Sequence, residues 1–162
     1  MLDGASFADL VRNMDYPMFI VTVGGAEPAG CLVGFATQTS IDPARFAVGI
    51  SKQNRTFDVA VAASHAAVHL LDADDLELAR LFGETTGDEV DKFALCRWHV
   101  GLHGVPTLDA AAGLFVGRII DRWDAGDHLV HLLDPLSVEI RRLTAGTLTF
   151  DAVRDFHPGH DA

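Results

Sequence analysis

The six residues from Ser51 to Thr56 combine the side chains that proteins use to hold an anion. Lys52 and Arg55 are positively charged, and Ser51 and Thr56 offer hydroxyl donors, in a loop expected between a strand and a helix. The first backbone N–H groups of a helix are free to bind a negative group. The segment therefore predicts a phosphate-binding loop. A simpler interpretation stays open, in which Asn54 caps the helix while Lys52 and Arg55 face solvent.

A second hydroxyl-rich segment covers residues 34–40, Gly-Phe-Ala-Thr-Gln-Thr-Ser. It ends a predicted strand with small and polar residues, so its backbone donors and acceptors would be accessible to a ligand. The alternative is a strand with a polar face turned to solvent. Taken together, residues 34–40 and 51–56 describe a site for a ring compound that carries a phosphate.

Other candidate ligands in the sequence have spacings that do not suit a metal. His65 and His69 fall in a predicted strand, where residues four apart stand roughly 13 Å from each other. His99 and His103 have the same spacing but fall in a predicted loop, and this spacing unites two ligands only on a helix. Two distant cysteines match no metal or redox motif. We therefore expect no metal site and a cytoplasmic protein with free thiols.

Composition limits the partners that the chain can bind. The 162 residues include 12 Lys and Arg against 23 Asp and Glu, for a net charge of −11, and 49% are hydrophobic. Such an acidic surface repels nucleic-acid phosphates and anionic membranes, so neither is an expected partner. No apolar run reaches the roughly 18 residues of a membrane span, and the first ten residues lack the basic region of a signal peptide. An anionic ligand must therefore meet a local cluster such as residues 51–56.

The predicted elements are mostly strands with short helices between them. Strands are expected at residues 18–23, 29–40, 44–51, 66–71, 113–122 and 128–140, and helices at 6–13, 56–63 and 74–82. Turn-rich connections at 24–28 and 123–127 predict hairpins, which favour an antiparallel barrel over a parallel Rossmann sheet. A polar loop is expected after the helix that ends at residue 82, up to about residue 109. We expect one domain over residues 1–150, followed by a frayed tail over 151–162.

Several motifs occur in an order that is typical of one family. They are residues 30–56 with an Asp-Pro turn, residues 75–82 ending in Leu-Ala-Arg-Leu-Phe, Asp-Lys-Phe at 91–93, Gly-Val-Pro-Thr-Leu at 104–108 and Gly-Asp-His at 126–128. In these motifs the chain resembles the flavin reductase-like family, up to about residue 140. The resemblance implies a mainly β protein, a six-stranded antiparallel Greek-key split barrel with short inserted helices. It also implies a homodimer with FMN bound near the interface.

The resemblance assigns three groups of cofactor-binding residues and one residue near the reductant. It implies that Gly34, Phe35, Ala36, Thr37 and Gln38 line the flavin ring and ribityl chain, that Ser51, Lys52, Arg55 and Thr56 hold the phosphate, and that Phe82, Lys92 and Phe93 close over the flavin. His128 would orient the nicotinamide. The simpler interpretation of His128, a polar residue at the mouth of a hairpin, stays open.

The implied activity is hydride transfer from NADH or NADPH to FMN, with reduced flavin passing to a monooxygenase or another electron-transfer partner. The flavin itself performs this chemistry, so the protein must bind it and orient the nicotinamide, and no general base is required. Two alternatives stay open. One is an electron carrier that keeps FMN bound and has no nicotinamide activity, and the other is a split barrel that holds a deazaflavin or haem.

Overall fold

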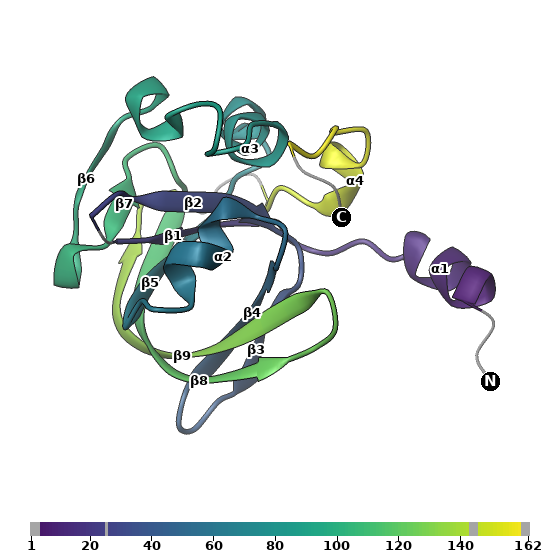
Figure 1. Ribbon diagram of the computed structural model, residues 1–162, viewed down its shortest axis with the longest axis horizontal. Coiled ribbons are helices and arrows are strands. Elements are labelled where there is room, and N and C mark those ends of the chain that lie inside the picture. The colour runs from purple at the N-terminus through teal and green to yellow at the C-terminus, as the bar shows by residue number, and fades with distance from the viewer. Residues whose placement is uncertain (1–3, 25, 143–145, 160–162) are drawn as a thin grey trace.

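The computed structural model describes residues 4–24, 26–142 and 146–159, and in these segments strands dominate (Figure 1). The strands are β1 Phe19–Val23, β2 Ala29–Val33, β3 Ala36–Ser40, β4 Arg45–Ser51, β5 His65–Leu70, β6 Trp98–Val100, β7 Pro106–Leu108, β8 Gly113–Asp124 and β9 His128–Ile140. The helices are α1 Gly4–Arg12, α2 Arg55–Ala60, α3 Leu76–Glu84 and α4 Phe150–Val153, with 3₁₀ turns η1 Lys92–Leu95 and η2 Leu102–Gly104. None of the helices that the structure describes is long and apolar enough to cross a membrane.

The main sheet is antiparallel and has seven strands, in the order β2-β1-β5-β8-β9-β4-β3. The expected count of six was wrong because the strand predicted over residues 29–40 is interrupted at Gly34 and Phe35. A Cβ at Gly34 would lie 2.6 Å from Cε2 of Tyr16, so any larger residue here would require the tyrosine ring to move. Beyond this point the chain changes partner, and β2 and β3 become the two opposite edges of the sheet.

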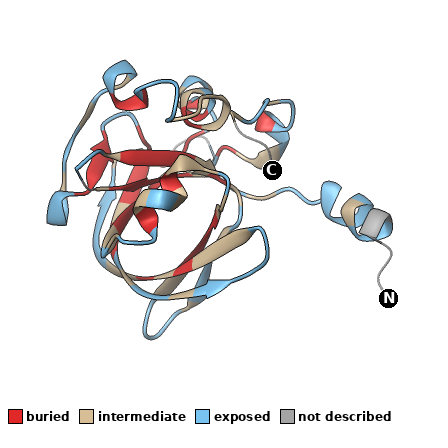
Figure 2. Ribbon diagram, in the orientation of Figure 1, coloured by how far each residue is buried: buried red, intermediate tan, exposed pale blue. Residues whose placement is uncertain are grey.

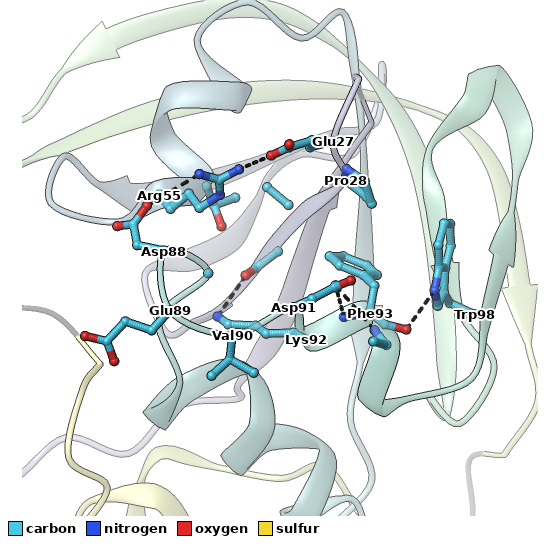
Figure 3. Close-up of a pocket in the computed structure, with 15 residues that line it drawn as sticks. Glu27, Pro28, Arg55, Asp88, Glu89, Val90, Asp91, Lys92, Phe93 and Trp98 are labelled. Carbon is cyan, nitrogen blue, oxygen red and sulfur yellow. Dashed lines mark hydrogen bonds and ion pairs between the residues drawn. The ribbon is translucent and has the colours of Figure 1, made fainter.

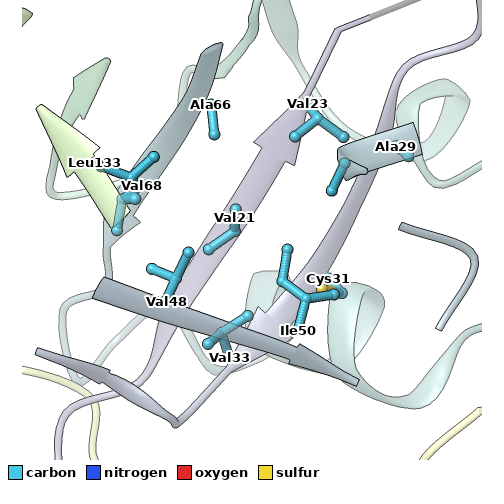
Figure 4. Packing of buried hydrophobic residues seen from close by; sticks show 11 residues of the cluster. Val21, Val23, Ala29, Cys31, Val33, Val48, Ile50, Ala66, Val68 and Leu133 are labelled. Carbon is cyan, nitrogen blue, oxygen red and sulfur yellow. The ribbon is translucent and has the colours of Figure 1, made fainter. Parts of the chain in front are cut away.

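The sheet curls around a core of small and branched apolar side chains (Figure 4). Val21 from β1, Val48 from β4 and Val68 from β5 lie in the same cluster, although their strands are not all neighbours in the sheet. β-branched residues favour strands and pack well on a pleated surface. The hairpins predicted around residues 24–28 and 123–127 are confirmed as β1–β2 and β8–β9. Strand pairing within the described residues leaves the sheet open between its edge strands β2 and β3. The Gly49 N–H donates to the Phe35 carbonyl at 2.7 Å, which extends the β3–β4 pairing up to the break.

A second cluster fills the space between the sheet and α3. Phe82 and Ala79 of α3 are fully buried against Ile20 and Leu71, and Figure 2 shows this layer as buried segments beneath an exposed outer surface. Residues 83–109, expected to be a loop, contain η1, the β6–β7 pair and η2. Elements of three or four residues are too short to show a periodic pattern in sequence.

The C-terminal residues expected to be frayed begin as α4, which packs on the body. Val153 is buried, and the Phe150 ring stacks on Tyr16 at 4.9 Å between centroids. The Phe150 N–H also donates to the Tyr16 carbonyl at 2.8 Å. The end of the chain thus contacts the segment that precedes β1, and this pairing of distant segments cannot be read from local sequence patterns.

One histidine of the interior joins two elements and must be neutral to do so. His69 of β5 is fully buried, its Nδ1 lies 3.0 Å from the Ile20 carbonyl, and its Nε2 accepts from Leu108 N–H at 3.0 Å. This pattern requires a proton on Nδ1 and none on Nε2. Burial lowers the pKa of His69 from 6.5 to about 4.

We predict that acid weakens the fold through His69. Its folded pKa lies below the unfolded value, so the unfolded chain binds the proton first as pH falls, and stability is lost between about pH 6.5 and pH 4. The full effect is at most about 3 kcal/mol. Urea unfolding between pH 7 and pH 4 should give a flatter profile for His69→Gln than for wild type. The exposed control His157→Gln should keep the wild-type slope, and equal slopes in all three proteins would contradict the prediction.

Candidate functional site

Two cavities lie next to each other at the connection between β4 and α2. The first, here called the His128 cavity, has a volume of about 420 Å³ and is lined by Ser51, Asn54 and His128 among others. The second, called the Lys92 cavity, has a volume of about 660 Å³ and is lined by Arg55, Thr56 and Lys92 among others. Both volumes fall in the range of small-molecule sites.

The His128 cavity gathers five of the predicted site residues from four separate segments. They are Gly34, Phe35, Ser51, Phe82 and His128. The break between β2 and β3 supplies the first two, the end of β4 the third, α3 the fourth and the start of β9 the fifth. Because β4 pairs with β9, Ser51 stands directly opposite His128. Sheet register thus unites residues that are 77 positions apart in sequence.

Aromatic rings form a wall of the His128 cavity. The centroids of Phe35 and His128 lie 4.9 Å apart, and a Cβ at Gly49 would lie 3.3 Å from Phe35 Cβ, so glycine leaves the space that these rings occupy. His128 Nδ1 lies 2.7 Å from a carboxylate oxygen of Asp127. The His128 ring thus lines the cavity at the mouth of the β8–β9 hairpin.

The charge in this cavity differs from that of the whole protein. Among the described residues that line it, Arg154 is the one with a formal charge at neutral pH, and no carboxylate contributes to the wall. Arg154 lies over the Phe150 ring at 4.7 Å from the centroid. The wall is therefore less acidic than the chain as a whole, although Asp127 and Asp151 lie behind it, paired with His128 and Arg154.

The start of α2 lies between the two cavities. Asn54 caps this helix, as the simpler interpretation of residues 51–56 expected. The Asn54 side chain accepts from the Thr56 N–H at 2.9 Å. The Lys52 side chain is partly exposed, and its ammonium donates to the Asp124 carboxylate and to the Gly126 carbonyl, both at 2.6 Å. These bonds tie the start of α2 to the β8–β9 turn, next to His128.

The Lys92 cavity has a more acidic wall (Figure 3). Arg55 forms ion pairs with Glu27 and, at 3.5 Å, with Asp88, so it joins the β1–β2 hairpin to the loop before η1. Lys92 is buried, and its ammonium donates to the carbonyls of Gly30 and Phe82 at 3.2 Å each. Burial lowers the pKa of Lys92. Both cations are thus already engaged with protein groups.

The remaining predicted residues are dispersed. Thr56 and Phe93 line the Lys92 cavity, whereas Gln38 lines a third cavity on the sheet, described further below. Ala36, Thr37 and Lys52 line none of these three cavities in the part of the chain that the structure describes. Sequence reasoning missed Tyr16, Phe150, Arg154 and Phe156, which close one side of the His128 cavity. No motif marks them, because two ends of the chain meet there.

The histidines considered as metal ligands have other contacts. His65 and His103 stack face to face with ring centroids 4.0 Å apart, and His99 Nδ1 lies 2.7 Å from Asp109. Within the described residues, no three His, Cys, Asp or Glu side chains are grouped so that they could hold a metal ion. Cys31 and Cys96 are both free thiols.

The fold and the cavity define a small, mainly β protein with a curled antiparallel sheet and a ligand-sized aromatic cavity. Comparison of the sequence with protein-family models identifies its family. The model of the flavin reductase like domain matches residues 11–158. The chain therefore belongs to this family. The match extends past residue 150 and so includes α4.

Curated relatives share between a quarter and a third of their residues with the chain. The reductase subunit Stc3 of stachydrine N-demethylase from Rhizobium meliloti is 28% identical over 71% of this chain and 50% of its own. The 4-hydroxyphenylacetate 3-monooxygenase reductase component of Pseudomonas aeruginosa is 27% identical over 94% and 89%. The FMN reductase (NADH) RutF of Klebsiella pneumoniae is 27% identical over 97% and 94%. The chain thus spans about half the length of the first of these relatives.

A solved structure with the same fold contains ligand fragments. The NADH:FAD oxidoreductase SgcE6 of Streptomyces globisporus C-1027, in complex with NAD and FAD fragments, superposes with a TM-score of 0.81. It is 25% identical, and the match covers 99% of each chain. The architecture of the two proteins is therefore shared from end to end.

We predict that the Asn54 cap stabilises the site connection by an amount typical of helix caps. Asn54→Ala should lower the free energy of unfolding by about 1 kcal/mol, because the Thr56 N–H loses its side-chain acceptor. Chemical denaturation measures this difference. The neighbouring exposed residue provides the control, and Gln53→Ala should change stability by less than about 0.5 kcal/mol. Equal effects of the two substitutions would refute the role of the cap.

Proposed function

We propose that the protein is a flavin reductase that transfers a hydride from NADH or NADPH to FMN bound in the His128 cavity. The observation that carries this proposal is the meeting of Gly34, Phe35, Ser51, Phe82 and His128 around one cavity. Family membership supports it, as do relatives named FMN reductase (NADH) and a fold neighbour in complex with NAD and FAD fragments.

The residues present suit a flavin. A flavin ring is broad, flat and mostly apolar, with polar atoms along its edge, and the cavity offers Phe35, Ile50 and Phe82 together with hydroxyl, amide and imidazole groups. Phosphate binding is assigned to Ser51, Lys52, Arg55 and Thr56, in the connection that borders the cavity. The glycine at position 49 keeps the aromatic wall free of a further side chain.

When bound, the flavin supplies the electron-accepting chemistry, and the protein supplies position. Phe35 and His128 present a wall against which a planar group can stack. Asp127 accepts from the Nδ1–H of His128 and so holds the imidazole in one orientation. His128 is thereby placed to orient a nicotinamide beside the ring, and no proton transfer is required of it.

We further propose that the protein acts as a homodimer with the split-barrel architecture of its family and the cofactor near the interface, and that it supplies reduced flavin to a monooxygenase. Support for the second part comes from relatives named as a monooxygenase reductase component and as a demethylase reductase subunit. Large apolar side chains exposed on the surface of the single chain support the homodimer.

The first experiment is oxidation of NADH and of NADPH by the purified protein, with and without added FMN. We expect FMN-dependent oxidation of at least one nicotinamide. Tight FMN binding without oxidation of either would favour the electron carrier instead. A protein that binds a deazaflavin or haem in preference to FMN would overturn the proposed cofactor.

We predict that His128→Ala separates reductant use from cofactor binding. The kcat/KM for the nicotinamide should fall by roughly tenfold or more, whereas the Kd for FMN should change by less than about threefold. Steady-state oxidation and flavin fluorescence titration measure the two quantities. His157→Ala, an exposed histidine outside the cavity, should behave as wild type in both assays. Parallel losses in the two assays, or none, would argue against an orienting role.

The phosphate assignment can be tested by comparing FMN with riboflavin, which lacks the phosphate. We predict that wild type binds FMN more tightly, and that Lys52→Ala/Arg55→Ala narrows the difference at least tenfold, since two cations are removed beside the cavity. A control that removes two distant cations, Arg97→Ala/Arg118→Ala, should preserve the difference. An unchanged ratio in the first variant would place the phosphate elsewhere.

A further inference from the structure

Helix α1 stands away from the body with an apolar face turned to solvent (Figure 1). Phe7, Leu10 and Val11 share one face of the helix, and Met14 follows two residues after its end; their exposed fractions are 55%, 66%, 37% and 55%. None of the four belongs to a hydrophobic cluster among the described residues. A helix of nine residues is marginal in water without tertiary contacts, so this face calls for a partner surface.

The segment that carries α1 is held in place by polar contacts. The Arg154 guanidinium donates to the Arg12 carbonyl at 2.7 Å, and the Asp15 carboxylate accepts from the Asp151 N–H at 2.9 Å. Tyr16 then stacks on Phe150, and Pro17 pairs with Thr149. The helix is thereby directed away from its own chain, which disfavours an intramolecular lid.

The same chain displays an apolar cleft on its sheet. This cleft, here called the Phe46 cleft, has a volume of about 430 Å³ and is lined by Phe19, Phe46, Phe115, Val138 and Ile140 among others. The rings of Phe19 and Phe115 lie edge-on to Phe46, at 5.5 and 5.2 Å between centroids. Val138 and Ile140 are 70% and 66% exposed. A monomer would thus leave both the helix face and the cleft in water.

We infer that α1 is a docking arm that packs its apolar face into the Phe46 cleft of a second copy of this chain. The inference rests on the proposed homodimer and names the segment and surface that form it. An isologous dimer satisfies both surfaces at once, because each copy gives one arm and receives one. An apolar helix face laid in an apolar groove is a common mode of recognition.

Area and charge favour this occupant. The arm exposes about 400 Å² of apolar side chain, and covering two arms and two clefts buries roughly 1,000 Å², about the smallest area expected of a specific interface. The opposite face of the helix carries one acid and one base, Asp9 and Arg12, which pair at 2.9 Å. A helix that binds a membrane surface carries a basic polar face, so a lipid surface is disfavoured.

The decisive experiment compares two double variants of α1 by sedimentation over a range of protein concentrations. Phe7→Ser/Leu10→Ser removes half of the apolar face and should raise the dimer Kd at least tenfold. Asp9→Ser/Arg12→Ser changes the opposite face, keeps the net charge and introduces the same residue type, so it should leave the Kd within about twofold. A dimeric wild type whose Kd is the same in both variants would overturn the arm and leave the homodimer standing. A monomeric wild type would overturn both.

A second measurement locates the contact directly. Leu10 is replaced by the photo-crosslinking p-benzoylphenylalanine, and light and ¹⁵N-labelled protein are mixed before irradiation. We expect mixed light–heavy cross-links to peptides that contain residues 44–46 or 136–140. Cross-links within one chain would assign α1 to its own body, and cross-links to other peptides of the second copy would reject the Phe46 cleft. FMN binding and nicotinamide oxidation are measured on the same samples, so a failure of the proposed function stays separate from a failure of the arm.

Discussion

The close approach of Tyr16 to the backbone at Gly34 is the constraint on which the rest of the structure depends. A Cβ at this position would lie 2.6 Å from the tyrosine ring, so a larger residue would displace the ring, and this contact coincides with the break between β2 and β3. The break sends β2 and β3 to opposite edges of the sheet and turns Phe35 toward His128. On its other side Tyr16 stacks on Phe150, which anchors the end of the chain beside the same cavity. One packing contact thus shapes the sheet, the cavity and its C-terminal wall.

Electrostatics decide which cavity suits an anionic cofactor. The chain is strongly acidic, and several carboxylates face the Lys92 cavity, where Arg55 is held by two of them and Lys92 by two backbone carbonyls. The His128 cavity has no carboxylate among its described lining residues. The buried Lys92 ammonium already uses two of its three N–H donors on those carbonyls, which limits what it can offer to a further anion. The smaller cavity is therefore the better candidate for a flavin, although the larger one also contains residues of the family motifs.

The apolar surfaces and the cavity belong to one arrangement. The segment that directs α1 outward is held by Arg154, which also lines the His128 cavity. Phe19 begins β1 immediately after Met18, and the first lines the Phe46 cleft while the second lines the His128 cavity. A second copy bound at the cleft would therefore lie close to the site, which agrees with a cofactor near the interface.

The sequence by itself determined the local elements and their pairing in hairpins, because these depend on short-range patterns. The strand β9 was predicted with its observed bounds, and the cap of α2 was foreseen at Asn54. The family motifs also marked five residues of the His128 cavity, since each lies within a recognisable local motif. Residue type, the spacing of apolar residues and turn residues are sufficient to predict strands, helix caps and local motifs.

Only the tertiary structure decided how these elements come together. The break at Gly34 depends on a tyrosine 18 positions earlier, and the wall of the cavity depends on Phe150 and Arg154 at the far end of the chain. The charges of Lys52, Arg55 and Lys92 were visible in sequence, but their partners were not, because each partner lies in a distant segment. These contacts depend on long-range packing, which local sequence periodicity does not reveal.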